Sequence, residues 1–247
     1  MKLVLTEPKI LTDSISIISE LVNEVRLKID KDKIELIAMD PANVAMVIFN
    51  LLSSVFAEYH IEKPKEISIN LDHFKQVLKR AKPSDTLTIE LDEDKNKLNI
   101  KIKGDSTRTF NISLLSLTDQ EQKIPNLKFP AKIETNTLIF NEAIEDMNVV
   151  SESVAFIADK DKFLIKSESK LNDAEVEINQ GNETKIDTEE KSHSKYSLEY
   201  LKKIIKGSKL TNNILIQFGN DYPLRVDYTS KDKLSMSFIL APRVSND

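Results

Sequence analysis

Residues 71–91, LDHFKQVLKRAKPSDTLTIEL, contain the pattern that decides the fold, because a similar stretch recurs later in the chain. Residues 198–218, LEYLKKIIKGSKLTNNILIQF, align with them without a gap at an offset of 127 residues, from Leu71 to Leu198. Lysines coincide at three of the aligned pairs of positions. An offset of about half the chain indicates two similar domains and not a solenoid of short repeats.

The hydrophobic pattern predicts the same kinds of element in both halves. Apolar residues recur at i, i+3 and i+4 and predict helices over 7–22, 71–81, 140–150 and 197–208. Alternating runs such as VRLKID, IELIAMD, EISINL and KLNIKIKG, separated by turn residues, indicate antiparallel strands. We therefore expect an α+β fold of two duplicated domains, each with two short helices packed on antiparallel sheets.

A polar segment separates the two copies. Residues 118–134, TDQEQKIPNLKFPAKIE, carry Pro125 and Pro130 and should run as an extended connector. The expected division is an N-terminal domain over 1–117, an interdomain connector over 118–134 and a C-terminal domain over 135–247. Length alone, at 247 residues, also allows one large domain.

The composition excludes several kinds of chemistry. The chain has no cysteine, and its 3 histidines are widely separated, which excludes disulfides and leaves no zinc-like ligand spacing. With 4 glycines there is no phosphate-cradling glycine motif. Acidic clusters such as Asp92–Asp94 fall in predicted turns, where carboxylates do not converge on one site. We expect no catalytic residue, no metal and no cofactor.

The same composition describes a folded protein without a membrane segment. Hydrophobic residues make up 40% of the chain and charged residues 30%, values typical of a globular domain. The longest apolar stretch, residues 44–57, is too short and interrupted to span a bilayer, and the N-terminus has no apolar signal region. We expect a cytoplasmic protein.

Each repeated segment carries a basic ridge, although the net charge of the chain is −5. Lysines recur at i, i+4 and i+7 on a helical face other than the apolar one, and residues 71–82 and 198–209 each have a net charge of +3. An ordinary solvated face is one interpretation. Two equivalent copies favour the other, a sequence-independent contact with the phosphates of duplex DNA. Few aromatic residues accompany the ridges, so stacking on single strands is not favoured.

Three motifs resemble a known family. LIAMDPANVAMV (36–47), NDYPLRVDY (220–228) and LAPRV (240–244), together with the duplication and the paired basic helices, resemble the archaeal and eukaryotic sliding clamps of the proliferating cell nuclear antigen type. The resemblance covers essentially the whole chain. It implies a pseudo-sixfold trimeric ring with helices around a central hole, and a DNA polymerase processivity factor that encircles duplex DNA and tethers replication and repair enzymes.

The resemblance assigns the basic residues to the lining of the hole. The expected DNA-facing residues are Lys9, Lys75, Lys79, Arg80, Lys82, Lys202, Lys203, Lys206 and Lys209. The first helix of each half departs from this expectation, because apart from Lys9 its charged residues, such as Glu20 and Glu142, are acidic. The hole is therefore expected to be less positive beside these two helices.

The resemblance also implies a pocket for short client peptides with apolar and aromatic anchors. The expected pocket residues are Met39, Val44, Met46, Ile124, Pro125, Pro223, Ala241, Pro242 and Arg243. Core packing is the alternative for Met39 and Val44, and Gln122 stands where an apolar connector residue is expected. The implied clients are DNA polymerase, the clamp loader, flap endonuclease and ligase.

Subunit contacts in the family join an edge strand of one domain to an edge strand of the other. Here these strands are expected near 108–117 and 173–179. The expected interface residues are Arg108, Phe110, Ile112, Leu114, Glu175, Val176, Glu177 and Ile178. A homotrimer and a heterotrimer both stay open, and the alternative function is a clamp-like subunit of a hetero-oligomeric ring that does not close by itself. The location would be cytoplasmic and nucleoid-associated in an archaeon, and nuclear in a eukaryote.

Overall fold

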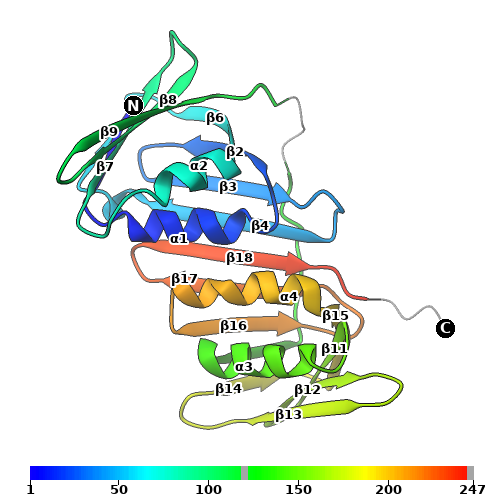
Figure 1. Cartoon of the computed structure of the whole chain (residues 1–247). Coiled ribbons are helices and arrows are strands. Elements are labelled where there is room, and N and C mark those ends of the chain that lie inside the picture. Colours follow the sequence, from blue (N-terminus) through cyan, green and yellow to red (C-terminus); the bar gives the residue numbers. More distant parts are fainter. Residues whose placement is uncertain (118–121, 244–247) are drawn as a thin grey trace. The chain divides into compact units, whose positions relative to one another are not determined.

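The computed structural model of the chain describes residues 1–117 and 122–243 (Figure 1). The chain divides into two compact units, which are described separately. The first unit consists of Met1–Pro41, Val47–Lys123 and Ser230–Ser235, and the second of Ala42–Met46, Ile124–Thr229 and Met236–Asp247.

The elements of the first half of the chain follow the order strand, helix, five strands, helix and three strands. Its elements are β1 (Lys2–Leu5), α1 (Lys9–Ile18), β2 (Glu24–Ile29), β3 (Lys33–Met39), β4 (Ala45–Leu52), the 3₁₀ turn η1 (Ser53–Val55), β5 (Glu58–His60), β6 (Lys65–Asn70), α2 (Leu71–Leu78), β7 (Thr86–Asp92), β8 (Lys97–Lys103) and β9 (Thr107–Ser113). Strands are neighbours in the orders β5-β1-β7-β8-β9 and β4-β3-β2-β6. Helices α1 and α2 lie side by side against these strands (Figure 1).

The second half repeats this order. Its elements are β10 (Ala131–Asn136), α3 (Thr137–Asn148), β11 (Ser153–Asp159), β12 (Lys162–Glu168), β13 (Asp173–Asn179), β14 (Lys185–Thr188), β15 (Ser192–Ser197), α4 (Leu198–Ile204), the 3₁₀ segment η2 (Ile205–Lys209), β16 (Asn213–Phe218), β17 (Leu224–Ser230) and β18 (Leu234–Leu240). Strands are neighbours in the orders β14-β10-β16-β17-β18 and β13-β12-β11-β15, which match those of the first half strand for strand.

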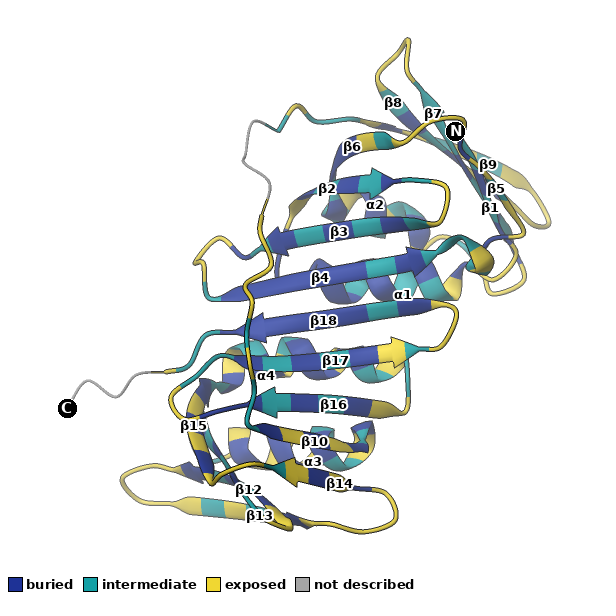
Figure 2. Ribbon diagram, turned by 180° about the vertical axis from the view of Figure 1, so that it is seen from behind, coloured by how far each residue is buried: buried dark blue, intermediate teal, exposed yellow. Residues whose placement is uncertain are grey.

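The repeat predicted from the sequence is therefore confirmed, and so is the α+β fold of two duplicated domains. Helices α2 and α4 begin at Leu71 and Leu198, and β9 and β18 begin at Thr107 and Leu234, so the offset of 127 residues extends to the end of the repeat. The apolar positions of the pattern form the core of each unit. Figure 2 shows buried residues alternating with intermediate or exposed ones along most strands, as one-sided packing of a sheet requires.

The core of the second unit contains a cluster of aromatic rings centred on Phe156. Its ring lies 5.3–5.9 Å from those of four neighbours in edge-on or tilted geometry, namely Phe140, Phe163, Tyr196 and Phe218. These rings come from α3, β12, β15 and β16, so the cluster fixes the helix against both groups of strands.

The helices differ from their predicted limits for local reasons. Helix α2 ends at Leu78 and not at residue 81, because the amides of Arg80 and Ala81 donate to the carbonyls three residues back, Val77 and Leu78, which tightens the last turn. The segment predicted as one helix over 197–208 becomes α4 followed by η2. The other two helices, predicted over 7–22 and 140–150, are Lys9–Ile18 and Thr137–Asn148.

Two further observations concern the connector and the membrane. Strand β10 begins at Ala131, inside the range expected for the connector, because Ala131 and Ile133 are buried. Residues 118–121 of the expected connector lie outside the described residues.

None of the helices in the described ranges has the length and apolar character that crossing a bilayer requires.

Candidate nucleic-acid interface and docking surface

Helix α2 presents the first basic ridge. The side chain of Asn70 caps its N-terminus by accepting a hydrogen bond from the His73 amide at 3.0 Å. Leu71, Phe74 and Leu78 are buried, so the opposite face is directed to solvent. Lys75 forms an ion pair with Asp72 at 3.1 Å and is the most buried lysine of the ridge.

Most of the positive charge of the first ridge lies beyond the end of α2. Residues 79–85, called the basic loop below, contain Lys79, Arg80 and Lys82, all of them exposed. Lys82 Nζ lies 3.0 Å from Asp105, an exposed pair of small energetic value. The basic loop closes on a partly buried ion pair, in which Arg108 Nη2 lies 2.6 Å from Asp85 Oδ2.

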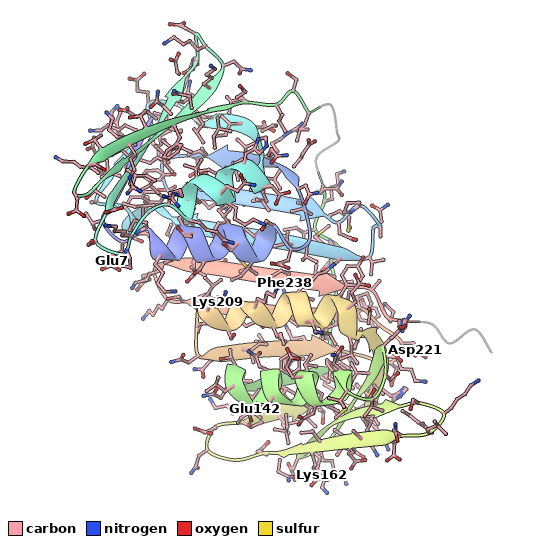
Figure 3. The ribbon with its side chains drawn as sticks, viewed as in Figure 1. Glu7, Glu142, Lys162, Lys209, Asp221 and Phe238 are labelled. Carbon is pink, nitrogen blue, oxygen red and sulfur yellow. The ribbon has the colours of Figure 1, made fainter. Side chains whose placement is uncertain are left out.

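Helix α4 and η2 present the second ridge. Leu198, Leu201 and Ile204 are buried, while the side chains predicted to face DNA lie on the other side; the exposed ones are Lys202, Lys206 and Lys209. Lys203 is partly buried, pairs with Glu199 at 3.3 Å and lies 5.2 Å from the centre of the Tyr200 ring. Figure 3 labels Lys209 at the end of this segment.

The first helix of each half carries little positive charge. On α1, Lys9 forms an ion pair with Asp13, one turn further along the helix. On α3, Glu142, Glu145 and Asp146 are exposed (Glu142 is labelled in Figure 3). Positive charge in each helix pair is thus concentrated on the second helix and the segment after it.

The residues expected in the client pocket differ in how much surface they offer. Ile124 is 45% exposed and is one of the few exposed large apolar residues of the described chain. Met46 is only 3% exposed, so it offers little area to a peptide. Val44 and Ala241 are brought together, because the Ala241 amide donates to the Val44 carbonyl at 2.9 Å. Pro125 is exposed, and Pro223 and Pro242 are half-buried.

Met39 and Arg243 have neighbours that the sequence does not reveal. Met39, at the end of β3, lines a cleft in the first unit together with Ile37, Leu117 and Gln122. The Arg243 amide donates to the Lys195 carbonyl at 2.7 Å, and Arg243 Nη1 to the Glu152 carbonyl at 3.4 Å. Its side chain lines a cleft with three lysines of the second ridge, Lys202, Lys203 and Lys206.

The two expected interface segments are edge strands with the same burial pattern. Strands β9 and β13 each end a row of strands, and along both of them exposed residues alternate with more buried ones. Ile112 and Ile178 are buried, and Phe110 and Val176 are half-buried. Leu114 follows β9, and its amide donates to the Asn96 carbonyl at 3.0 Å.

Most charged residues of these strands, Arg108, Glu175 and Glu177, already have partners within the chain. Glu175 forms an ion pair with Lys166, and Glu177 lies 3.1 Å from Lys162. Hydrogen bonds from the Asn179 and Lys162 side chains lower the pKa of Glu177. The guanidinium of Arg108 turns toward Asp85, so this residue can offer little more than its backbone to a neighbouring strand.

The described residues show no arrangement for metal chemistry. Within 1–117 and 122–243, no three His, Asp or Glu side chains are grouped in a way that could hold a metal ion.

Comparisons with known proteins agree with this geometry. The family model described as the N-terminal domain of proliferating cell nuclear antigen matches residues 1–123, and the model of the C-terminal domain matches residues 123–243. A DNA polymerase sliding clamp from Thermococcus gammatolerans is 37% identical over 234 residues, which are 94% of each chain. One from Pyrococcus furiosus is 36% identical over 228 residues, 92% of this chain and 91% of that protein.

Solved structures lead to the same family. A crystal structure of PCNA from Thermococcus kodakaraensis matches with a TM-score of 0.91 and 26% identity, over 98% of this chain and 99% of that one. A PCNA2–PCNA3 complex from Sulfolobus tokodaii shares the fold with a TM-score of 0.88, at 24% identity over 98% of this chain and 99% of that one. The chain described here belongs to the proliferating cell nuclear antigen family, with its N-terminal and C-terminal domains in one polypeptide.

Proposed function

We propose that the chain is a DNA polymerase sliding clamp, which encircles duplex DNA, tethers enzymes to it and performs no chemistry. The observation that carries the proposal is the pair of equivalent basic ridges at α2 and α4 in a chain with a net charge of −5. Lysines on a helical face contact phosphates without reading sequence. A closed ring holds DNA topologically, so these contacts can be weak enough to permit sliding. The proposal includes a location on nucleoid DNA in the cytoplasm.

The ring is proposed to form by head-to-tail pairing of β9 of one subunit with β13 of the next. Both strands have an unpaired edge in the described chain, and an edge with alternating apolar residues requires a partner or protection. A head-to-tail contact generates a ring when its rotation closes. The hetero-oligomeric ring is the alternative, and the PCNA2–PCNA3 complex is an example of two different clamp chains in one complex.

The proposed clients dock through short peptides whose apolar and aromatic anchors enter the surface around Ile124. The partial exposure of Ile124 beside Pro125 supports this proposal, because exposed apolar groups on a connector are suited to capture a helical turn. DNA polymerase is the first proposed client. The clamp loader, flap endonuclease and ligase are proposed to use the same surface.

The DNA-facing role is tested by reversing four lysines to glutamate, at Lys79, Lys82, Lys206 and Lys209. We expect loader-dependent stimulation of polymerase to fall, because the ridges would then repel the DNA phosphates. The solution mass of the assembled protein should stay unchanged. The matched control reverses four exposed lysines in turns between strands, Lys31, Lys63, Lys170 and Lys231, and changes the net charge equally. Equal stimulation by the two variants would refute the lining role.

A further inference from the structure

Asp85 is a buried carboxylate at the end of the basic loop. Its side chain is 3% exposed, although the loop itself lies at the surface. One oxygen, Oδ2, accepts hydrogen bonds from the Lys82 amide at 2.9 Å and from Arg108 Nη2 at 2.6 Å. The Asp85 amide in turn donates to the Lys82 carbonyl at 3.0 Å. The carboxylate therefore holds the backbone of Lys82 from inside the loop.

Arg108 makes a second connection to the same loop. It lies on β9, and its Nη1 donates to the Arg80 carbonyl at 2.9 Å while Nη2 binds Asp85. The planar guanidinium thus connects two points of the loop, Arg80 and Asp85, on either side of residues 81–84. A planar fork with fixed donor directions constrains its acceptors more than a flexible ammonium group does.

The surroundings leave little room for another arrangement. A Cβ atom at Gly104 would lie 2.0 Å from Asp85 Oδ1, so the carboxylate packs directly against the backbone of the next hairpin. Arg108 Nε is buried and has no hydrogen-bond partner among the described residues. A buried carboxylate that lost its guanidinium would be an uncompensated charge, which strongly favours the paired geometry.

The second half of the chain has no counterpart of this pair. At the offset of 127 residues, Asp85 corresponds to Asn212 and Arg108 to Ser235. The fold of the repeat therefore does not require the ion pair, since the second half has the same strand order without it. The pair is a specific property of the loop that carries Lys79, Arg80 and Lys82.

We infer that Asp85 and Arg108 are positioning residues that hold the basic loop in the geometry in which its cations meet DNA phosphates. The inference rests on the proposed clamp function. It has an unusual consequence: a negative charge within a DNA-facing loop strengthens DNA binding, because it orders the backbone of Arg80 and Lys82. If Asp85 acted only through its charge, it would repel the phosphates and weaken DNA binding.

The two explanations predict opposite effects of removing the Asp85 charge on DNA affinity, and this provides the test. Asp85→Asn and Asp105→Asn each remove one negative charge from the neighbourhood of Lys82, but the Asp105 side chain is 94% exposed and is paired with the ammonium group of Lys82, not with the backbone of the loop. We expect Asp105→Asn to bind a short labelled duplex at least as tightly as the parent. We expect Asp85→Asn to bind it more weakly, with a slope of log affinity against log salt that is shallower by about one. Fluorescence anisotropy measures both, and light scattering checks that assembly is unchanged.

Hydrogen exchange gives a readout that does not depend on DNA. Amides in the peptide that covers residues 79–85 should exchange faster in Asp85→Asn and in Arg108→Lys, which keeps the charge but loses the fork, and at the parental rate in Asp105→Asn. The inference would be overturned if the Asp85→Asn variant bound DNA as tightly as the Asp105→Asn variant and its loop amides exchanged at the parental rate. Lys79→Glu separates this outcome from failure of the proposed function. If Lys79→Glu weakens DNA binding, the inference alone fails; if it does not, the DNA-facing role of the loop fails as well.

Discussion

The two halves of the repeat stabilise the segment after their second helix with different residues. In the first half a partly buried ion pair between Asp85 and Arg108 holds the basic loop. In the second half the chain passes close to the buried ring of Tyr228, where a Cβ atom at Gly207 would lie 2.3 Å from Tyr228 Cε2. Burial raises the pKa of Tyr228, and its hydroxyl has no hydrogen-bond partner in the described residues. Close packing against this ring therefore helps to hold η2, together with a hydrogen bond from Asn141 Nδ2 to Ser208 Oγ at 2.9 Å.

Gly207→Ala should destabilise the protein by about 1–3 kcal/mol, because the added methyl group overpacks the contact with Tyr228. Urea unfolding measures the change as a lower midpoint with an unchanged slope. Gly181→Ala is the matched control, since a Cβ atom there would meet nothing within 4 Å. Equal midpoints for the two variants would show that η2 does not depend on close approach to the ring.

The sequence predicts where basic residues gather on helices but not which distant side chains fix their positions. Arg108 lies in an alternating strand pattern, and the family resemblance implies that it contacts the next subunit. Its partner within the chain, Asp85, is separated from it by the whole of β7 and β8, and no local pattern encodes that pairing. Arg243 is similar, because its position beside Glu152 depends on how distant segments of the second unit pack.

At the scale of elements, the repeat allowed most of the fold to be predicted. Helices α2 and α4 occur where the aligned apolar positions require them, and β7 and β16 follow at the same offset. The limits of the helices were less predictable. Apolar periodicity continues past Leu78, but the hydrogen bonds there change to the i→i−3 pattern, which ends the helix earlier. Strand β10 was partly assigned to the connector because its residues, AKIETN, are mostly polar.

The connector is the element to test for client docking. Ile124→Ser should weaken binding of a labelled peptide with aromatic and aliphatic anchors by about tenfold. The reason is that the exposed part of the isoleucine side chain is buried only when the peptide binds, and the serine variant lacks this apolar area. DNA retention and the unfolding midpoint should stay at parental values. The affinity can be measured by titration calorimetry.

Leu171→Ser is the control for this experiment. Leu171 is 92% exposed in the turn between β12 and β13, so its loss removes a similar apolar side chain from another surface. Equal peptide affinity for Ile124→Ser and Leu171→Ser would place the docking surface elsewhere. A loss of DNA retention in Ile124→Ser would assign the connector a different role.

For the whole molecule, the charges on the two edges bear on whether a ring closes from identical subunits. The face formed by β8 and β9 carries Lys97, Lys101 and Lys103, and its other side chains there are uncharged. The corresponding face of β12 and β13 carries four acidic residues and two lysines; the acidic residues are Glu168, Asp173, Glu175 and Glu177. One edge is therefore positive and the other negative. This complementarity favours head-to-tail pairing of identical chains over a ring that requires different subunits.

The purified chain should therefore assemble by itself into a species of about three times 28.1 kDa in light scattering at micromolar concentration. Replacing Lys101 and Lys103 by glutamate should shift the mass toward the monomer, because two acidic edges then face each other. The same change at Lys31 and Lys63, exposed in turns of the first unit, should leave the mass unchanged. A parent chain that stays monomeric or dimeric would favour the hetero-oligomeric ring, and mixing it with candidate partner subunits should then restore the trimer. A trimer that persists in the Lys101 and Lys103 variant would show that the apolar residues of the edges, and not their charges, close the ring.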